Sequence, residues 1–433
     1  MMKKTILIGL LFLFILPLNA QKREAKKYLT QNKELQHTHI GISIYDPAKD
    51  KVIFQHNGSR YFTVASNNKL YTLYAAKRYL TDSTTGIQYQ RQNDTLYIRG
   101  TGDPSFLHPD FKDQPVYDFL VKEQLPIAVV ETKNENGRFG PAWAWDYYNA
   151  GWQPERSAFP IYGNVIQFYT GAGTLQSTPD YFAQPEHLEK EDKNPPYRAS
   201  FYVQRKERAN RFTYRIKDFT SSRKQAVPFI PSDELIARLL QDTLKKPVTT
   251  SAVELADQNW KNVRNVPLDS LLTPMMHRSD NFFAEQTQYM VSMALFNEIN
   301  SVRLIDHLKQ YDFKFPDHPV LLDGSGLSFG DLSSPDDLIT VLKLLYAQVD
   351  HQELFDILPT GDTGTLEGLY KDLSGKLFAK TGTLNKAVAL SGYLLTKKNK
   401  LLFFSTVING LTESSNLGRK QTEKFIQAVY EKN

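Results

Sequence analysis

The feature of this sequence that most constrains its fold is that its clearest β-strand signals lie at the two ends of the chain. Near the start, the segments 39–46 and 51–56 flank the turn "PAKD" and predict a hairpin. Near the end, three further segments predict an antiparallel meander: 376–384, 388–395 and 401–408. A helix is expected after them, around 419–432. Because every strand needs hydrogen-bonding partners, we expect the two ends of the chain to join in one antiparallel sheet of five strands.

The chain between these ends has two kinds of sequence. Long helical patterns occur at 281–296, 301–311 and 335–349. In contrast, 82–262 is rich in Tyr, Gln, Pro and Gly. It holds the short strand candidates 95–100, 165–170, 199–205 and 211–219. We predict an α/β domain made of 21–81 and 263–433, into which 82–262 is inserted as one β-rich unit or two nested ones.

The first residues, "MMKKTILIGLLFLFILPLNAQK", have the layout of a secretory signal peptide. Two lysines precede an apolar run from Ile6 to Leu16, Pro17 ends the run, and Ala20 is a small residue at a suitable cleavage site. The run is shorter than the roughly 20 residues that a membrane span needs. We therefore expect 1–20 to be removed and the protein to be exported. The absence of cysteine suits a bacterial periplasm.

Composition excludes several other kinds of function. Without cysteine, the chain has no disulfide framework, no thiol nucleophile and no thiolate metal site. The formal net charge of +5 is too small to argue for nucleic acid, and no basic stripe stands out. The nine histidines form no His-Glu-x-x-His motif, so the sequence predicts no metal.

The segment "ASNNKLYT" (65–72) combines a helix-start signal with an unusual charge. Ser66 precedes an apolar-periodic run, as an N-cap residue does, but the third residue after it is Lys69 and not the Glu or Gln of a capping box. A cation is mildly unfavourable beside the positive end of a helix. Lys69 is therefore either a solvated lysine or an amine that loses its proton easily and takes the proton of the Ser66 hydroxyl.

Two more motifs follow in the chain. "SDN" at 279–281 precedes the helix predicted at 281–296, and "KTG" at 380–382 lies in a predicted strand. Each has a structural alternative when taken alone, because Ser279 suits a helix cap and a strand lysine is usually solvated. A second Ser-x-x-Lys, at 221–224, lies in a polar stretch that predicts no helix. The information is therefore in the combination and order of the three motifs.

Together the motifs supply the positive charge and the hydrogen bonds that acyl transfer needs. Lys380 would help to keep Lys69 neutral and would attract a substrate carboxylate. Thr381 would donate a hydrogen bond to that carboxylate. Gly382 would leave room for the substrate to lie against the strand.

The remaining groups would serve the reacting bond. The backbone N–H groups of Ser66 and Thr383 would form an oxyanion hole. Ser279 would relay a proton toward the leaving group. Asn281 would hold the substrate amide and the Lys69 side chain.

In this order and context, the motifs resemble those of the low-molecular-mass class C penicillin-binding proteins, the serine D-Ala-D-Ala carboxypeptidases and endopeptidases. The resemblance runs from about residue 38 to the C-terminus. Four further segments are similar to family segments in the family order: "GTGDPSF" (100–106), "DGSGLS" (323–328), "LPTGDTGTLEG" (358–368) and "AKTGTLNKAVALSGYL" (379–394). The resemblance implies a penicillin-recognising α/β fold, with an antiparallel sheet flanked by helices, a helical lobe and inserted domains.

The resemblance also implies a reaction. Ser66 would attack the penultimate D-Ala of a peptidoglycan stem peptide and expel the last D-Ala, and water would free the enzyme. β-Lactams would acylate Ser66 as covalent inhibitors, and no cofactor would be needed. Asp146 in "AWAWDYYNAGW" matches an Asp that reaches the site in some relatives, or else lies in a surface turn. Many members have Arg where this chain has Phe329, which leaves the side-chain selectivity open.

Two other functions use parts of the same sequence pattern. A β-lactamase shares the acylation motifs, but the long stretch between Ser66 and Ser279 argues against one. A catalytically idle peptidoglycan-binding module is disfavoured because all the motif residues are intact. The balance of carboxypeptidase and endopeptidase action and the oligomeric state have no signal in the sequence.

Overall fold

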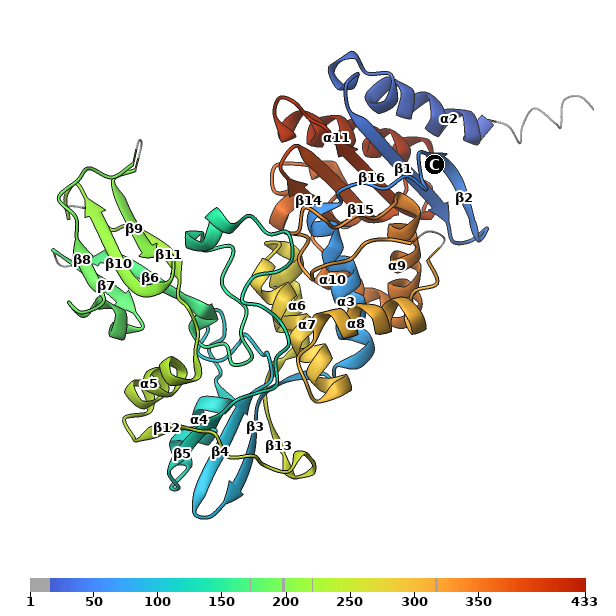
Figure 1. Ribbon diagram of the computed structural model, residues 1–433. Helices are drawn as coiled ribbons and strands as arrows, with labels where there is room; N and C mark the ends of the chain where they lie inside the picture. The colour runs from blue at the N-terminus through green and yellow to red at the C-terminus, as the bar shows by residue number, and fades with distance from the viewer. Residues whose placement is uncertain (1–15, 172, 197–198, 220, 316–317) are drawn as a thin grey trace, which may run out of the picture. The chain divides into compact units, whose positions relative to one another are not determined.

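The computed structural model describes residues 16–433 except 172, 197–198, 220 and 316–317 (Figure 1). These residues form two compact units, which are described one at a time. The first contains the described part of Met1–Arg78 with Leu272–Asp280 and Ile305–Asn433, and the second contains Tyr79–Leu271 and Asn281–Leu304. Most of the predicted signal peptide, 1–20, lies outside the described residues.

The first unit is built on one antiparallel sheet of five strands, in the order β14-β15-β16-β1-β2 (Figure 1). The strands are β1 His39–Asp46, β2 Lys51–His56, β14 Leu377–Leu384, β15 Ala387–Leu395 and β16 Leu401–Asn409. The two chain ends meet where β1 pairs with β16, from His39 opposite Asn409 to Tyr45 opposite Phe403. The sheet predicted from the two ends of the sequence is therefore confirmed.

The two faces of this sheet differ in what they carry. On one face, residues such as Ala379 of β14 join an apolar core that includes side chains of helix α11 (Ser415–Lys432). Helix α2 (Leu16–Ala25) adds its last residue to the same core. Because side chains alternate along a strand, Lys380 and Gly382 of β14 lie on the other face.

That other face is covered by helices. Helix α9 (Pro335–Gln348) packs there, and its Leu342 carbonyl accepts a hydrogen bond from the Tyr393 hydroxyl of β15 at 2.8 Å. Helix α3 (Lys69–Tyr79) follows the short 3-10 turn η3 (Ala65–Asn68) and is buried on all sides through its first two turns. The remaining helices that contribute to the unit are α6 Leu268–His277, α8 Ser301–His307 and α10 His351–Ile357.

The second unit contains three sheets. A mixed sheet has the order β12-β5-β4-β3-β13, and two smaller sheets have the orders β8-β10-β9 and β11-β6-β7. The strands are β3 Ser83–Gln92, β4 Thr95–Gly100, β5 Ile127–Val130, β6 Val165–Gly171, β7 Thr174–Thr178, β8 Leu188–Lys190, β9 Phe201–Lys206, β10 Ala209–Ile216, β11 Lys224–Pro228, β12 Val248–Ser251 and β13 Lys261–Pro267. The helices are α4 Pro115–Lys122, α5 Asp233–Leu244 and α7 Asn281–Phe296. The four strand candidates named from the sequence are found as β4, β6, β9 and β10.

The division into units does not follow the predicted domains throughout. Helix α7 groups with the second unit, whereas the sequence assigns it to the domain made of 21–81 and 263–433. Spatial grouping alone does not define where an independently folding domain ends, so these boundaries and the inserted region 82–262 stay a prediction. Along the described part of the chain, no helix is both long enough and apolar enough to cross a bilayer.

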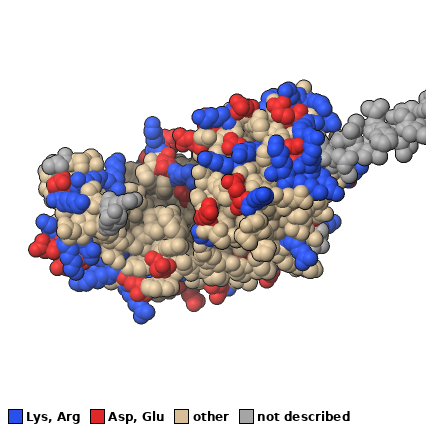
Figure 2. Space-filling view, turned by 90° about the horizontal axis from the view of Figure 1, so that it is seen from above, with Lys and Arg blue, Asp and Glu red and all other residues tan. Residues whose placement is uncertain are grey.

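Charged side chains of both signs are interspersed over the face of the molecule seen in Figure 2. Basic side chains gather near the start of the described chain. There, the exposed residues of α2 and the turn after it include Lys22, Arg23, Lys26 and Lys27. Part of the small positive net charge is therefore concentrated at this end of the first unit.

Candidate active site

Ser66 lies inside the turn η3 and not at the helix N-cap position that the sequence suggested. Val64 occupies the N-cap position, and Ala65 after it has a left-handed backbone with φ of 49°. Such a conformation costs a non-glycine residue about 1 kcal/mol or more. The N-cap interpretation of Ser66 is wrong, because this sharp turn carries the chain past the capping position before the serine.

Lys69, the first residue of α3, lies beside the Ser66 hydroxyl. Its Nζ donates to Ser66 Oγ at 3.1 Å and to the Ser325 carbonyl at 2.7 Å. The Lys69 side chain is fully buried. It is therefore not the solvated lysine of the alternative interpretation. A serine hydroxyl hydrogen-bonded to a buried amine is an arrangement that suits an activated nucleophile.

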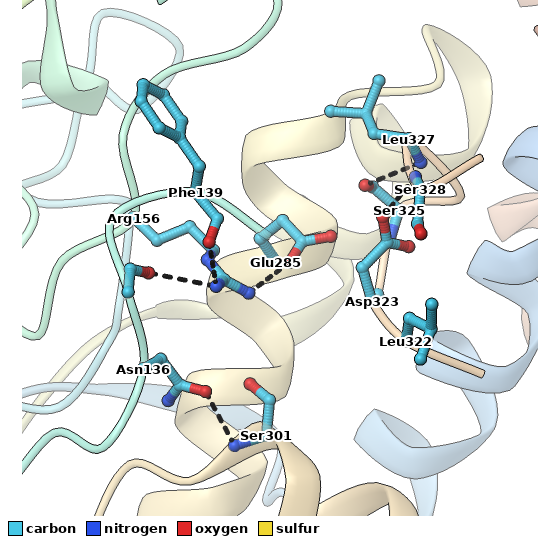
Figure 3. A network of polar contacts seen from close by, with 12 residues as sticks. Asn136, Phe139, Arg156, Glu285, Ser301, Leu322, Asp323, Ser325, Leu327 and Ser328 are labelled. Carbon is cyan, nitrogen blue, oxygen red and sulfur yellow. Dashed lines mark hydrogen bonds and ion pairs between the residues drawn. The ribbon is translucent and has the colours of Figure 1, made fainter. Parts of the chain in front are cut away.

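The Ser325 carbonyl is presented by the loop 323–328. The buried carboxylate of Asp323 accepts hydrogen bonds from the backbone N–H groups of Ser325 at 3.2 Å and Ser328 at 2.7 Å, and Figure 3 shows these residues together. The Asn68 side chain donates to the Asp323 carbonyl at 2.7 Å. The carboxylate therefore fixes the shape of the loop, and Asn68 ties the loop to the turn η3.

Gly326 allows this loop to approach the turn that carries Ser66. A Cβ atom at Gly326 would lie 2.0 Å from the Ala65 carbonyl oxygen and 3.0 Å from the Ser66 nitrogen. Its φ of 78° is also unfavourable for residues other than glycine. Both the backbone conformation and the contact therefore require glycine here.

Strand β14 lies against the same turn from the sheet side. The Asn67 side chain donates to the Lys380 carbonyl at 3.0 Å. A Cβ atom at Gly382 would lie 2.5 Å from the Val64 carbonyl oxygen. The absence of a Cβ atom at Gly382 therefore allows the strand to reach the turn, and the "KTG" motif lies next to the Ser66 segment.

Lys380 is a second fully buried amine. Its Nζ donates to Ser279 Oγ and to the Thr381 carbonyl, both at 2.8 Å. Burial, with a further contribution from the charge of Lys69, holds the pKa of Lys380 well below its usual value. The two amines therefore lie close enough for each charge to act on the other.

Thr381 and Thr383 have partners that the sequence analysis missed. The Thr381 hydroxyl donates to Thr365 Oγ1 at 2.7 Å, and Arg419 of α11 donates to Thr383 Oγ1 at 2.7 Å. Thr365, Thr381 and Arg419 line the same small pocket. A further cation and a further hydroxyl thus lie at the end of the site where the sequence places a substrate carboxylate.

Ser279 also has a left-handed backbone, with φ of 61°. This strain in a non-glycine residue is typical of functional sites. The next two candidates lie in the second unit. Asn281 begins α7 and donates from its side chain to the Trp152 carbonyl at 3.1 Å, whereas Asp146 is exposed in the turn η4 (Trp145–Asn149).

The first unit thus brings together the candidates Ser66, Lys69, Ser279, Lys380, Thr381 and Thr383, and their chemical roles stay predictions. Asp323 had a local signal, since an Asp followed by Gly and Ser is typical of an Asx turn. Thr365 and Arg419 had none, because both meet the site through long-range contacts. Within the described ranges, no group of three or more His, Asp or Glu side chains has a metal-binding arrangement.

Comparison with known proteins identifies a family and two curated relatives. A profile described as the D-Ala-D-Ala carboxypeptidase 3 (S13) family matches residues 21–429. The D-alanyl-D-alanine carboxypeptidase DacB of Haemophilus influenzae is 23% identical over 440 residues, which cover 90% of this chain and 89% of that protein. The carboxypeptidase DacB of Mycolicibacterium smegmatis is 32% identical over 165 residues, 34% of this chain and 35% of that protein.

Solved structures agree with this comparison at the level of the fold. The crystal structure of penicillin binding protein 4 (dacB) from Haemophilus influenzae has a TM-score of 0.73 at 20% identity, with 94% of this chain and 98% of that chain covered. Bd3459, a predatory peptidoglycan endopeptidase from Bdellovibrio bacteriovorus, has a TM-score of 0.51 at 14% identity, with 91% and 92% covered. The predicted penicillin-recognising α/β fold is confirmed.

Proposed function

Since the chain belongs to the D-Ala-D-Ala carboxypeptidase 3 (S13) family, the low-molecular-mass class C penicillin-binding proteins, we propose that it is an exported, periplasmic enzyme that hydrolyses peptidoglycan stem peptides through an acyl-enzyme on Ser66. The family resemblance found in the sequence is confirmed. So is the enzyme class, a serine-type D-Ala-D-Ala carboxypeptidase that acts on peptidoglycan.

The observation that carries the proposal is the hydrogen bond of 3.1 Å between Lys69 Nζ and Ser66 Oγ. A neutral Lys69 amine would take the hydroxyl proton while Oγ bonds to the carbonyl carbon of the penultimate D-Ala. Because the amine of Lys380 is also buried and its charge acts on Lys69, it is unfavourable for both lysines to be protonated at once. The backbone N–H groups of Ser66 and Thr383 would stabilise the developing oxyanion.

The other candidates would bind the substrate and release the leaving group. Lys380 and the Thr381 hydroxyl would hold the terminal carboxylate of the stem peptide. Ser279, which accepts a hydrogen bond from Lys380, would pass a proton to the amine of the departing D-Ala. Asn281 would hold the substrate amide, and Asp146 would also bind the substrate.

Water would then hydrolyse the ester on Ser66 and restore the free hydroxyl. The same two steps on a crosslink between stem peptides would be an endopeptidase reaction, because only the leaving amine differs. β-Lactams would acylate Ser66 in the first step. The slow second step would make them covalent inhibitors.

A labelled penicillin tests this proposal. We expect a stable adduct on the wild-type chain and none on Ser66→Ala. Ser221→Ala is the matched control, because it removes the serine of the other Ser-x-x-Lys, and it should label like the wild type. Rapid turnover of the label would instead indicate a β-lactamase, and no adduct on any variant would indicate an idle binding module.

A further inference from the structure

Three aromatic side chains on one short segment of the second unit are exposed. Trp145 is 71% exposed, Tyr147 40% and Trp152 48%. The rings of Tyr147 and Trp152 meet edge to face, with centroids 4.9 Å apart. We call these three residues the aromatic platform. Large aromatic rings are usually among the most buried parts of a protein, so a group of exposed rings marks an interaction surface.

The segment that presents the platform is held in place by the strands behind it. The Asn149 side chain donates to the Val203 carbonyl at 3.2 Å and accepts from the Arg205 backbone N–H at 2.8 Å. The Tyr148 hydroxyl donates to the Arg205 carbonyl at 3.3 Å. The rings are therefore exposed on a fixed backbone, and a ligand would bind them without the cost of ordering a loop.

A buried ion pair secures the end of the same segment. Arg156 Nη1 lies 3.1 Å from a carboxylate oxygen of Glu285 in α7, and both side chains are almost fully buried. Arg156 also donates to the carbonyls of Gly137 at 3.0 Å and Phe139 at 2.8 Å (Figure 3). The segment is thus attached to the helix that begins with Asn281.

The platform lies directly beside a candidate substrate residue. The carbonyl of Trp152 accepts the hydrogen bond of 3.1 Å from the Asn281 side chain. The exposed carboxylate of Asp146 stands between Trp145 and Tyr147 in the chain. Aromatic faces are therefore combined with a hydrogen-bond acceptor, next to the residue proposed to hold the substrate amide.

We propose that the aromatic platform binds the sugar rings of a peptidoglycan glycan strand. This inference rests on the proposed function for its choice of polymer. A pyranose ring has an apolar face of C–H groups that packs against the negative face of an aromatic ring. Its hydroxyl and acetamide N–H groups can donate to a carboxylate such as Asp146.

The glycan fits the platform better than the terminal alanines of the stem peptide do. Each alanine offers only a methyl group, which covers little of an indole ring. A sugar ring offers a flat face of similar size to the aromatic side chains. The rings of successive sugars can also contact more than one residue of the platform at once.

Tryptophan fluorescence tests the proposal directly, because three of the four tryptophans, Trp143, Trp145 and Trp152, lie in this segment. The full chain with Ser66→Ala, which cannot form an acyl-enzyme, is titrated with a soluble N-acetylglucosamine oligomer. We expect a saturable change in the emission. Adding Trp145→Ala should weaken the apparent affinity about fivefold or more.

Two control variants remove aromatic side chains that lie outside the aromatic platform. Trp260→Phe removes the tryptophan that packs on Arg99, and Tyr311→Ala removes an aromatic side chain that is 65% exposed in the first unit. Both should leave the apparent affinity for the oligomer unchanged. The proposal is overturned if no emission change occurs, if Trp145→Ala binds as tightly as its parent, or if a stem peptide without sugar gives the same response.

The penicillin adduct and the oligomer titration test sugar binding and acyl-enzyme formation separately. If the wild-type chain shows no penicillin adduct but the oligomer titration depends on Trp145, the platform stands and the acyl-enzyme proposal falls. If the adduct forms and the oligomer titration is flat, the acyl-enzyme proposal stands and the sugar-binding proposal falls. In a chain that keeps Ser66, Trp145→Ala should also lower the release of D-Ala from wall polymer, relative to its release from a free pentapeptide.

Discussion

At the scale of single residues, the site is defined by two buried lysines that donate to neutral oxygen atoms. Lys69 meets a hydroxyl and a carbonyl, and so does Lys380. Removing an ammonium group from water without full compensation costs several kcal/mol, roughly. A protein selected only for stability would not keep this arrangement. The two lysines are therefore expected to lower the stability of the first unit and to be kept because the proposed reaction needs them.

Lys380→Met should stabilise the first unit at neutral pH, by about 1–3 kcal/mol. The lowered pKa of Lys380 means that the unfolded chain binds more protons between the folded and the unfolded pKa values. The stability of the wild type therefore rises with pH through this window. The advantage of the variant should shrink as pH approaches about 10.4, the pKa of a free lysine. Urea unfolding across this range measures it.

The exposed Lys371→Met is the control for this experiment, and its stability should follow the wild type at every pH. A Lys380→Met protein that is less stable than the wild type at neutral pH would contradict the prediction. It would mean that the hydrogen bonds of the amine outweigh the cost of burying it.

Arg419→Ala should raise the KM for a peptide that ends in D-Ala-D-Ala by about fivefold, with a smaller effect on kcat. Arg419 contacts Thr383 at the proposed carboxylate end of the site, and an exposed cation contributes a modest amount to anion binding. Steady-state release of D-Ala measures both constants. Lys420→Ala removes the neighbouring exposed cation of the same helix. An equal rise in KM for that variant would contradict a specific role of Arg419 in binding the substrate carboxylate.

At the scale of elements, the site is a meeting of three segments: the turn η3, the loop 323–328 and the strand β14. Asn67 bonds the turn to the strand, and Asn68 bonds the turn to the loop. Glycine at Gly326 and Gly382 allows each neighbour to approach the turn. The turn that carries Ser66 is therefore held on two sides, which is the preorganisation that acyl transfer needs.

Gly326→Ala should reduce the rate of acylation by a labelled penicillin by about 100-fold, because the new Cβ would displace the Ser66 backbone. Gly368→Ala is a closely matched control. Gly368 has the same φ of 78°, but a Cβ there would meet nothing within 4 Å. Both variants carry the backbone penalty and only one has the clash. Equal acylation rates in the two would refute the role of the contact.

At the scale of the whole molecule, the second unit depends on buried ion pairs as well as on its apolar core. Arg205 and Glu155 are both fully buried and lie 2.5 Å apart, and Arg156 pairs with Glu285. Burial raises the pKa of Glu155, while its arginine partners lower it. Such pairs contribute little net energy but are costly to break, because one charge is left buried without its partner.

Arg156→Met should destabilise the second unit by about 3–5 kcal/mol, since it breaks the buried ion pair with Glu285. The double variant Arg156→Met with Glu285→Leu should recover the part of that loss that comes from the charge, but not the hydrogen bonds of Arg156 to Gly137 and Phe139. Chemical denaturation followed by tryptophan emission reports on this unit, where all four tryptophans lie. A double variant no more stable than the single one would show that the loss comes from the hydrogen bonds and packing of Arg156, and not from its charge.

Local sequence patterns predicted the strands of the first unit and four strands of the second, because alternation is a property of short segments. The strands predicted at 39–46 and 51–56 match β1 and β2, and the helix predicted at 281–296 matches α7. The N-cap interpretation of Ser66 failed for a reason that no local pattern shows. The left-handed Ala65 that shifts the serine is sustained by contacts to Gly326, far along the chain.

The sequence by itself determined the five strands of the first unit's sheet, the order of the three motifs and hence the family, since these follow from residue type and spacing along the chain. Only the tertiary structure decided what surrounds the Ser66 hydroxyl. The Ser325 carbonyl that binds Lys69, the Thr365 and Arg419 partners of the threonines, and the exposed rings beside Asn281 all depend on residues distant in sequence. Their physical cause is long-range packing, which brings such groups within hydrogen-bonding distance.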